Sequence, residues 1–345
     1  MCGVAWVGGT RVGSAEGLQL EGGRMVKISD ISVFLFPWGA KSPSVSEIVD
    51  AAKLAEELGF HSVTLSTHMT MPSGWLFRGL SRDVLDALVV VPAIAGATTT
   101  IRIGFNSILL PLLPPYQWAK YLTTLDVMSG GRLIVGASMG WWEEDFMAAG
   151  VDRTKRGRLF DEQLEVITSL WTEETTTFEG EHYQLENMTL EPKPIQKPYP
   201  PIWIGAGVKS IGRTARYGEY ILVLWPSEEE ARNLWVPRLA EEGMKWGRSP
   251  KLVSFAFAYV AENDDDLQAQ LPKLRETVAF SEDPPVDPMD VTVSGSPQRC
   301  AARINALAEA GVSHFVLEFR FRGLETVSFG MKQMERFAEE VAPLL

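Results

Sequence analysis

Cysteine and histidine are scarce in this sequence. Its 345 residues include two cysteines, Cys2 and Cys300, and four histidines. Two cysteines cannot form the disulfide framework of a secreted scaffold or a thiolate metal site, and the histidines are not spaced as metal ligands. We therefore expect no bound metal.

The chain also lacks an excess of positive charge and any long apolar run. It has 32 Lys and Arg against 44 Asp and Glu, a net charge of -12, which argues against nucleic acid or an anionic membrane as a partner. No apolar stretch reaches the roughly 20 residues of a membrane helix. Residues 1–25 have neither the basic start nor the apolar core of a secretion signal. We expect a cytoplasmic protein in which residues 1–25 are a flexible leader, with Met1 or Met25 as the natural start.

Short apolar strands alternate with helices over residues 26–345, which we expect to form one domain. The eight segments of strand length are residues 31–36, 61–65, 101–110, 133–135, 202–204, 220–224, 252–260 and 314–319. Eight is the closure number of the (β/α)8 TIM barrel, although an open, doubly wound sheet has the same alternation. A predicted hairpin and five prolines interrupt the pattern after strand four, which indicates an insertion at about residues 172–200. Residues 262–292 form a variable region.

The stretch at residues 129–142 carries the first chemical signal. Gly130 and Gly131 allow a tight turn, and residues 133–135 are consecutively apolar, as in a strand buried on both faces. Residues 136–140 then form a loop of small side chains. Parallel α/β proteins bind flat ligands at such a loop, although an ordinary βα connection has the same features.

His68 follows the second predicted strand, directly after Thr67. In a barrel this position faces the catalytic mouth, where a histidine can exchange a proton near neutral pH. A structural histidine is the alternative. His61 and His314 begin their strands, and we expect them to be structural and to lie at the opposite end.

Polar and aromatic residues mark other strand ends. Asn106 and Ser107 close the third strand, and buried polar groups there would need hydrogen-bond partners. Tryptophans fall in the loops after several strands, at Trp38, Trp75, Trp141, Trp142 and Trp225. Several at one rim suggest an aromatic pocket for a planar or apolar ligand, although each alone could be packing.

Gly205-x-Gly207-x-x-Ser210, between a strand and a helix, resembles a dinucleotide-binding fingerprint. Such a fingerprint needs an acidic residue at the end of the next strand to hold a ribose. That strand ends at Trp225 and Pro226 without one, so a nicotinamide-dependent dehydrogenase is disfavoured. The loop can still bind phosphate at the helix start, or its glycines simply turn the chain.

Several longer motifs together resemble the bacterial luciferase-like oxidoreductases. They are LDVMSGGRLIVG at 125–136, RGRLFDE at 156–162, FEGEHY at 178–183, LEPKP at 190–194, PPIWIG at 200–205 and AGVSHF at 310–315. The resemblance runs from about residue 31 to residue 317. It implies a TIM barrel with an insertion after strand four, dimeric in most members, that binds FMN or the deazaflavin F420 at the carboxyl ends of its strands.

The resemblance also implies roles for particular residues. His68 matches a histidine beside the flavin ring, although Thr67 replaces an acid that many members carry. Ser107 and Ile108 match a strand-three bulge that contains a non-prolyl cis peptide in the F420 branch. The cofactor-binding residues it implies are Thr67, Asn106, Ser107, Ile108, Ser138, Met139, Gly140, Gly205, Ala206, Gly207 and Ser210. The substrate pocket would include Trp38, Trp75, Trp141 and Trp225.

These observations lead to one leading function and two alternatives. We expect an F420-dependent oxidoreductase that transfers hydride to or from a small organic substrate, with His68 as the proton partner. The first alternative is a two-component monooxygenase that uses reduced FMN from a separate reductase. The second is a non-catalytic flavin-binding accessory subunit. Trp141 stands where the F420 sugar-phosphate dehydrogenases carry a glutamate, which argues against a sugar-phosphate substrate.

Overall fold

The computed structural model describes residues 25–35, 43–67, 84–205, 207–278, 287–320 and 326–345. The predicted leader lies almost entirely outside these residues. Within them, no helix is both long and apolar enough to cross a lipid bilayer.

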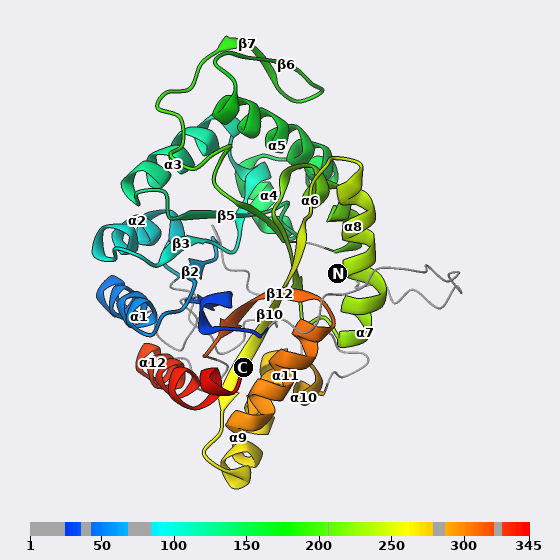
Figure 1. Cartoon of the computed structure of the whole chain (residues 1–345). Helices are drawn as coiled ribbons and strands as arrows, with labels where there is room; N and C mark the ends of the chain where they lie inside the picture. The colour runs from blue at the N-terminus through cyan, green and yellow to red at the C-terminus, as the bar shows by residue number, and fades with distance from the viewer. Residues whose placement is uncertain (1–24, 36–42, 68–83, 206, 279–286, 321–325) are drawn as a thin grey trace.

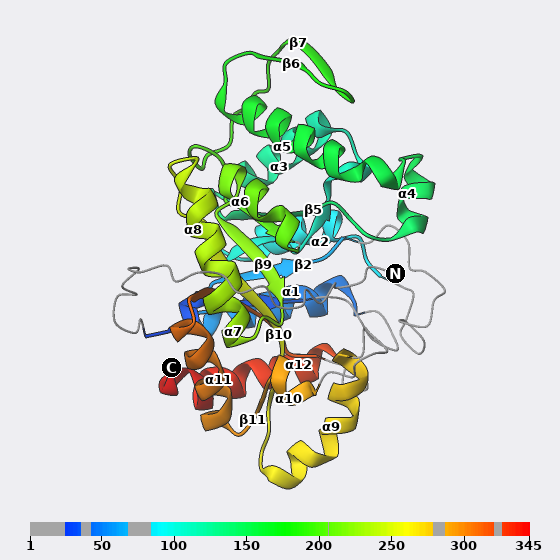
Figure 2. The ribbon, with the colours of Figure 1, turned by 90° about the vertical axis from the view of Figure 1, so that its right-hand side faces the viewer.

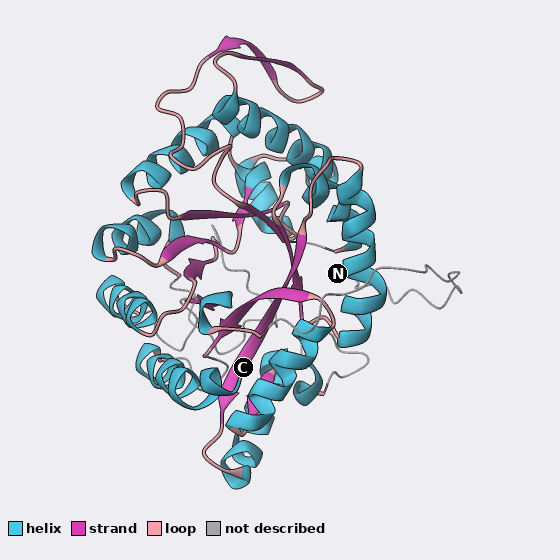
Figure 3. Cartoon of the chain, in the orientation of Figure 1, coloured by secondary structure: helices cyan, strands magenta, loops and turns pink. Residues whose placement is uncertain are grey.

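Eight parallel strands form a closed barrel at the centre of the molecule (Figure 3). They are β1 (Ile31–Phe34), β2 (Ser62–Leu65), β3 (Arg102–Phe105), β5 (Leu133–Ser138), β8 (Ile202–Gly205), β9 (Tyr220–Leu224), β10 (Lys251–Val260) and β12 (Val312–Glu318). Each pairs with the next in this order, and β12 pairs with β1, which closes the ring. The barrel predicted from the eight apolar segments is therefore confirmed, and the open sheet is excluded.

Helices surround the barrel on the outside (Figure 1). The main ones are α1 (Val45–Glu57), α2 (Ala87–Ala97), α3 (Pro115–Met128), α5 (Arg156–Thr172), α6 (Ile211–Tyr217), α8 (Val236–Met244), α11 (Pro297–Glu309) and α12 (Val327–Arg336). Local sequence sets their starts: the Ser44 side chain accepts from the N–H of Glu47, and Asp86 accepts from the N–H of Leu88. Apolar side chains on the outer face of the strands pack against these helices and form the larger core.

A second, smaller core fills the barrel itself. It contains Phe34, Ile134, Trp203, Leu222, Val253, Phe255 and Val316. Side chains alternate along a strand between the barrel interior and the helix layer. A side chain two residues beyond an interior residue on the same strand therefore also points into the barrel. At the carboxyl ends of the strands, such side chains line the open end of the barrel, which we call the mouth.

Two regions of the described chain, the insertion after strand four and the variable region, lie outside the simple alternation. The insertion after strand four contains the expected hairpin, β6 (Thr176–Glu179) and β7 (Gln184–Met188), which projects from one end of the molecule (Figure 2). The variable region contains α9 (Asp264–Val278) and α10 (Pro288–Val291), followed by a short strand, β11 (Val293–Gly295), that pairs with β10. Sequence reasoning missed β11 because three residues give no periodic pattern.

Gly104 and Gly136 let the backbones of β3 and β5 approach closely. A Cβ atom on Gly136 would lie 1.9 Å from the carbonyl oxygen of Phe105, and one on Gly104 would lie 2.2 Å from that of Ile134. Neither position can hold a side chain unless the backbone moves. These two glycines therefore set the spacing of the strands that carry part of the predicted site.

The strand after Gly136 is longer than predicted. β5 continues to Ser138, where the short strand β4 (Ile108–Leu109) pairs with it. The expected strand end at residue 135 is wrong because small side chains in this stretch allow β4 to lie alongside. The loop begins at Met139 instead.

A hydrogen-bonded polar cluster fills the amino end of the barrel. The Ser32 hydroxyl lies 2.7 Å from Nε2 of His314 and 2.6 Å from the Ser62 hydroxyl. The rings of His61 and His314 meet edge to face, with 4.6 Å between their centroids. Both histidines thus lie at the end opposite the predicted mouth, as expected from their positions in the sequence.

The stability of the fold should depend on pH through His61. Burial, aided by the positive charge of Arg102, lowers the pKa of the His61 ring to about 4. In the unfolded chain the ring takes up a proton at about pH 6.5. The free energy of unfolding should therefore fall as the pH drops from about 6.5 to about 4, by about 3 kcal/mol in total. Below the folded-state pKa this contribution should fall no further.

Urea unfolding of the wild type and of His61→Asn over this pH range measures the effect. The wild type should lose stability relative to the variant as the solution is acidified, because only the wild type carries the titrating ring. Parallel stability curves for the two proteins would show that His61 is not the responsible group.

Candidate cofactor site

Thr67, Ser107 and Ser138 come together at the carboxyl ends of β2, β3 and β5. The backbone N–H and the hydroxyl of Thr67 both donate to the carbonyl oxygen of Ser107, at 3.2 and 3.0 Å. The Ser107 hydroxyl donates to the Ser138 hydroxyl at 2.7 Å. Three residues predicted from the sequence thus form one hydrogen-bonded row across three neighbouring strands.

The bulge between β3 and β4 lies within this row. The N–H of Asn106 donates to the carbonyl oxygen of Leu65 at 2.8 Å, and the peptide bond between Asn106 and Ser107 is cis. Ile108 was also expected to contact a cofactor, but its side chain is buried in the core between strands and helices. The contact of Ile108 with a cofactor remains a prediction from the sequence.

The loops after β5 and β8 carry little side chain. Gly140 has a φ of +75°, which glycine adopts without penalty, and Met139 packs half-buried against the core. Gly205 ends β8, where a Cβ atom would lie 3.8 Å from Cβ of Ser138. A Cβ atom on Gly207 would meet nothing within 4 Å. The loops after β5 and β8 therefore carry few bulky side chains, which allows a flat ligand to come close to their backbone.

Ser210 ends the short 3-10 turn η5 (Val208–Ser210), which leads into α6. The residue is fully buried, and its hydroxyl has no hydrogen-bond partner among the residues that the structure describes. Unpaired buried hydroxyls are uncommon, and N–H groups at a helix start suit a phosphate. This loop therefore fits the phosphate end of a flavin-type cofactor.

Two of the predicted pocket tryptophans are described. Trp225 follows β9 with a φ of 51°, and its ring centroid lies 6.3 Å from that of Phe257 on β10. Trp141 is 46% exposed and stacks on Trp142 with 4.8 Å between ring centroids. Trp225 therefore belongs to the mouth of the barrel, whereas Trp141 lies at the surface of the described structure.

Four predicted site residues lie outside the described residues. They are His68, Trp38, Trp75 and Ala206. Their roles remain predictions from the sequence.

Sequence reasoning missed a charged pair on the other side of the mouth. Glu318 ends β12, Arg320 follows it, and both are buried. A polar residue that closes an otherwise apolar strand is the signal that identified Asn106. The same signal could have identified Glu318.

The closed barrel, with polar and glycine-rich loops gathered at one rim, defines a (β/α)8 protein of the kind that works at the carboxyl ends of its strands. The family is shown by its sequence model: residues 31–314 match the luciferase-like monooxygenases. The chain belongs to this family, whose members include F420-dependent enzymes and FMNH2-dependent monooxygenases.

Individual relatives differ in cofactor. The F420-dependent glucose-6-phosphate dehydrogenase of Kineococcus radiotolerans is 27% identical over 87% of this chain and 93% of its own length. The FMNH2-dependent dimethylsulfone monooxygenase of Pseudomonas putida is 28% identical over 46% of this chain and 43% of its own length. The chain spans 48% to 62% of the length of several other curated relatives that it matches.

Solved structures show the same fold. The monooxygenase RslO1 from Streptomyces bottropensis superimposes with a TM-score of 0.74 and 22% identity, over 91% of this chain and 98% of that one. This likeness supports the barrel architecture independently of the motifs.

Proposed function

We propose that this chain binds F420 and catalyses hydride transfer to or from a small organic substrate. The observation that carries the proposal is the hydrogen-bonded row of Thr67, Ser107 and Ser138, which leads to the glycine loop after β8. The row places hydroxyl groups along neighbouring strand ends, and the loop after β8 adds few bulky side chains. This arrangement suits a long flat ring with a phosphate at one end. When bound, the deazaflavin supplies the hydride chemistry.

The residues of the chain would hold and orient that ring. Ser107 and Ser138 place hydroxyl groups along its edge, and Gly205 and Gly207 let the backbone approach it. Ser210 and the N–H groups at the start of α6 would bind the phosphate. His68, the residue after Thr67, would exchange a proton with the substrate.

We prefer F420 over FMN because a relative matched over 93% of its own length is named as F420-dependent. The alternative is a monooxygenase that uses reduced FMN, as the shorter match to the dimethylsulfone enzyme suggests. Trp141 occupies the position of the sugar-phosphate enzymes' glutamate, so we propose a substrate of another class. Where the reduced cofactor is consumed, as in substrate reduction by F420 or in the FMN alternative, a separate reductase would supply it. Where the substrate gives the hydride, this chain would itself reduce F420. We place the reaction in the cytoplasm.

Titration with F420 and with FMN, each oxidised and reduced, tests this proposal. Binding should quench the tryptophan fluorescence, and F420 should bind at least about tenfold more tightly than FMN. Tight binding of FMN without binding of F420 would transfer the proposal to the monooxygenase. Binding of neither would contradict both.

We also propose a homodimer that forms through α2 and α3. The sequence of α2 contains no charged residue, and its Val89 is 72% exposed. A mainly apolar groove between the two helices is lined by Leu88, Pro92, Tyr121 and Met128, among others. A helix that is apolar all round is normally covered. Because the chain carries a net charge of -12, two copies repel each other least where the contact surface has no acidic groups.

Val89→Asp should separate this dimer into folded monomers, because it buries an unpaired carboxylate at the contact. Light scattering should give about twice 38.2 kDa for the wild type and 38.2 kDa for the variant. Met244→Asp is the matched control, since Met244 is 75% exposed on a different helix. A monomeric wild type, or a Val89→Asp protein that remains dimeric, would contradict the proposed interface.

A further inference from the structure

The barrel mouth has two chemically different halves. The polar row and glycine loops occupy the strand ends from β2 to β8. The remaining strands, β9, β10, β12 and β1, contribute Trp225, Phe257 and Phe34 among the residues described. The ring of Phe34 meets that of Phe255 edge to face at 5.3 Å. These three side chains are apolar, and the charged residues Glu318 and Arg320 stand at the end of β12.

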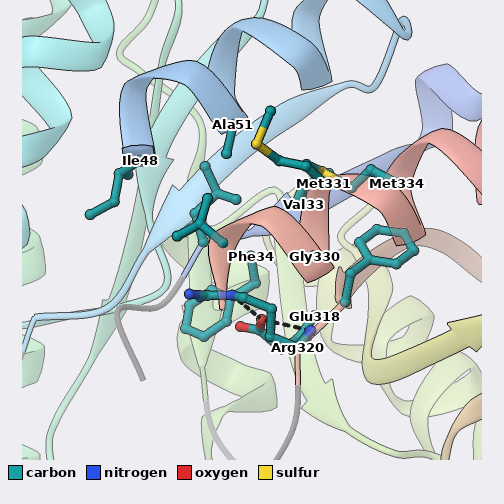
Figure 4. A pocket seen from close by; sticks show the side chains of 12 residues that line it. Val33, Phe34, Ile48, Ala51, Glu318, Arg320, Gly330, Met331 and Met334 are labelled. Atoms are coloured by element: carbon teal, nitrogen blue, oxygen red, sulfur yellow. Dashed lines mark hydrogen bonds and ion pairs between the residues drawn. The ribbon is translucent and has the colours of Figure 1, made fainter. Parts of the chain in front are cut away.

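Glu318 and Arg320 form a buried ion pair at that point. Their exposed fractions are 2% and 6%, and Nε of Arg320 lies 3.2 Å from Oε1 of Glu318. The same oxygen accepts the backbone N–H of Arg320 at 3.2 Å. Val316, two residues before Glu318, lies in the barrel interior, so Glu318 points to the same side. Figure 4 shows the pair beside Phe34.

Arg320 retains an unused donor. Its Nη2 is buried and has no hydrogen-bond partner among the residues that the structure describes. An unpaired buried donor on a charged group is costly, because the group has lost its hydration without replacement. Such a donor at the rim of a binding site is suited to a ligand atom.

The surroundings are shaped to hold the arginine. A Cβ atom on Gly330 of α12 would lie 2.8 Å from Cγ of Arg320, so the glycine leaves room for the arginine stem. The pocket that Glu318 and Arg320 line lies between the ends of β1 and β12 and the helices α1 and α12, where Ile48, Ala51 and Met334 also line it. It has room for about one water molecule. A single oxygen atom therefore fits beside the guanidinium.

We propose that Arg320 binds one neutral oxygen of the substrate, a carbonyl or a hydroxyl, on an otherwise apolar molecule. Glu318 already balances the charge of Arg320, so the pair has no net charge to offer to a carboxylate or phosphate. The apolar half of the mouth accommodates the remainder of the molecule. Glu318 is a positioning residue that fixes the guanidinium. This inference rests on the proposed function, which makes the mouth of the barrel the substrate site.

Binding of matched small probes to the cofactor-free chain tests the inference without turnover. Acetophenone, ethylbenzene and benzoate share an aromatic ring and differ in carrying a carbonyl, no oxygen or a carboxylate. Calorimetry or ligand-observed NMR should rank acetophenone first. In Arg320→Met the preference for acetophenone over ethylbenzene should fall about ten- to hundredfold, as expected for loss of a hydrogen bond to a charged group.

Further variants keep the test decisive if Arg320→Met folds poorly. Gly330→Ala displaces the arginine stem without removing its charge and should weaken the same preference. Glu318→Gln leaves the guanidinium charge unbalanced and should shift binding towards benzoate, which a merely structural role would not do. Lys245→Met is the control, because Lys245 pairs with Glu242 at the end of α8, just before the amino end of β10. It should leave all three affinities unchanged.

An unchanged acetophenone preference in folded Arg320→Met, or stronger binding of benzoate than of acetophenone by the wild type, would overturn the inference. Binding of F420 and of FMN is measured separately with the same proteins. If the wild type binds F420 but Arg320→Met keeps its probe preference, only this inference fails. If the wild type binds neither F420 nor FMN yet shows the probe preference, only the proposed function fails.

Discussion

Gly136→Ala should destabilise the barrel by about 3 kcal/mol or more and abolish cofactor binding. The added Cβ atom would lie 1.9 Å from the carbonyl oxygen of Phe105 and 3.3 Å from Cα of Asn106. The colliding atoms belong to the backbone of β3, so no side-chain rotation can relieve the contact. The strands must separate, and the Ser107–Ser138 hydrogen bond lies directly beyond them.

Urea unfolding followed by circular dichroism measures this loss, and fluorescence titration measures binding. Gly212→Ala is the control for stability, because a Cβ atom there would meet nothing within 4 Å and the residue lies in α6. It should change stability by less than about 1 kcal/mol. Equal stability of the two variants would show that β3 and β5 are not held together as described.

His68→Ala should lower the turnover rate about 100- to 10,000-fold while leaving the affinity for F420 nearly unchanged. The expectation rests on the sequence, which puts His68 directly after Thr67, and on Thr67 itself, which is bonded to the Ser107 carbonyl at the rim. A histidine at this point can exchange a proton near neutral pH, so the wild-type rate should depend on pH there and the variant rate should not.

The rate is measured from the absorbance of F420 on mixing with alcohols and ketones, first in the wild type and then in the variant. His68→Gln is the second variant, because it keeps polarity and approximate size but cannot titrate. If the wild type binds the cofactor and both variants turn over at the wild-type rate, His68 has no catalytic part. Binding without turnover in the wild type would favour the accessory-subunit alternative.

The barrel and half of its rim could be predicted from the sequence for a simple physical reason. Strands buried on both faces are continuously apolar, so eight such runs with intervening helices indicate a parallel α/β fold. The motifs that resemble the luciferase-like family favour the closed barrel over the open sheet. The carboxyl ends of those strands must then meet at one rim. Thr67, Ser107 and Ser138 stand at strand ends in the sequence, and the structure joins them by hydrogen bonds.

Other features depend on contacts that no local pattern encodes. The end of β5 is set by its pairing with β4. The burial of Ile108 depends on which face of the bulge between β3 and β4 packs against the helices. The unused donor of Arg320 arises because Gly330, on another helix, leaves space for the stem. Residue spacing along the chain carries no information about such long-range packing.

A crystal structure of the chain soaked with F420 tests the central claim most directly. The account predicts the ring along Ser107 and Ser138 at the carboxyl ends of β3 and β5, with the phosphate at Ser210 and the start of α6. A cofactor bound at the amino end, near Ser32 and His314, or outside the barrel mouth altogether, would contradict it.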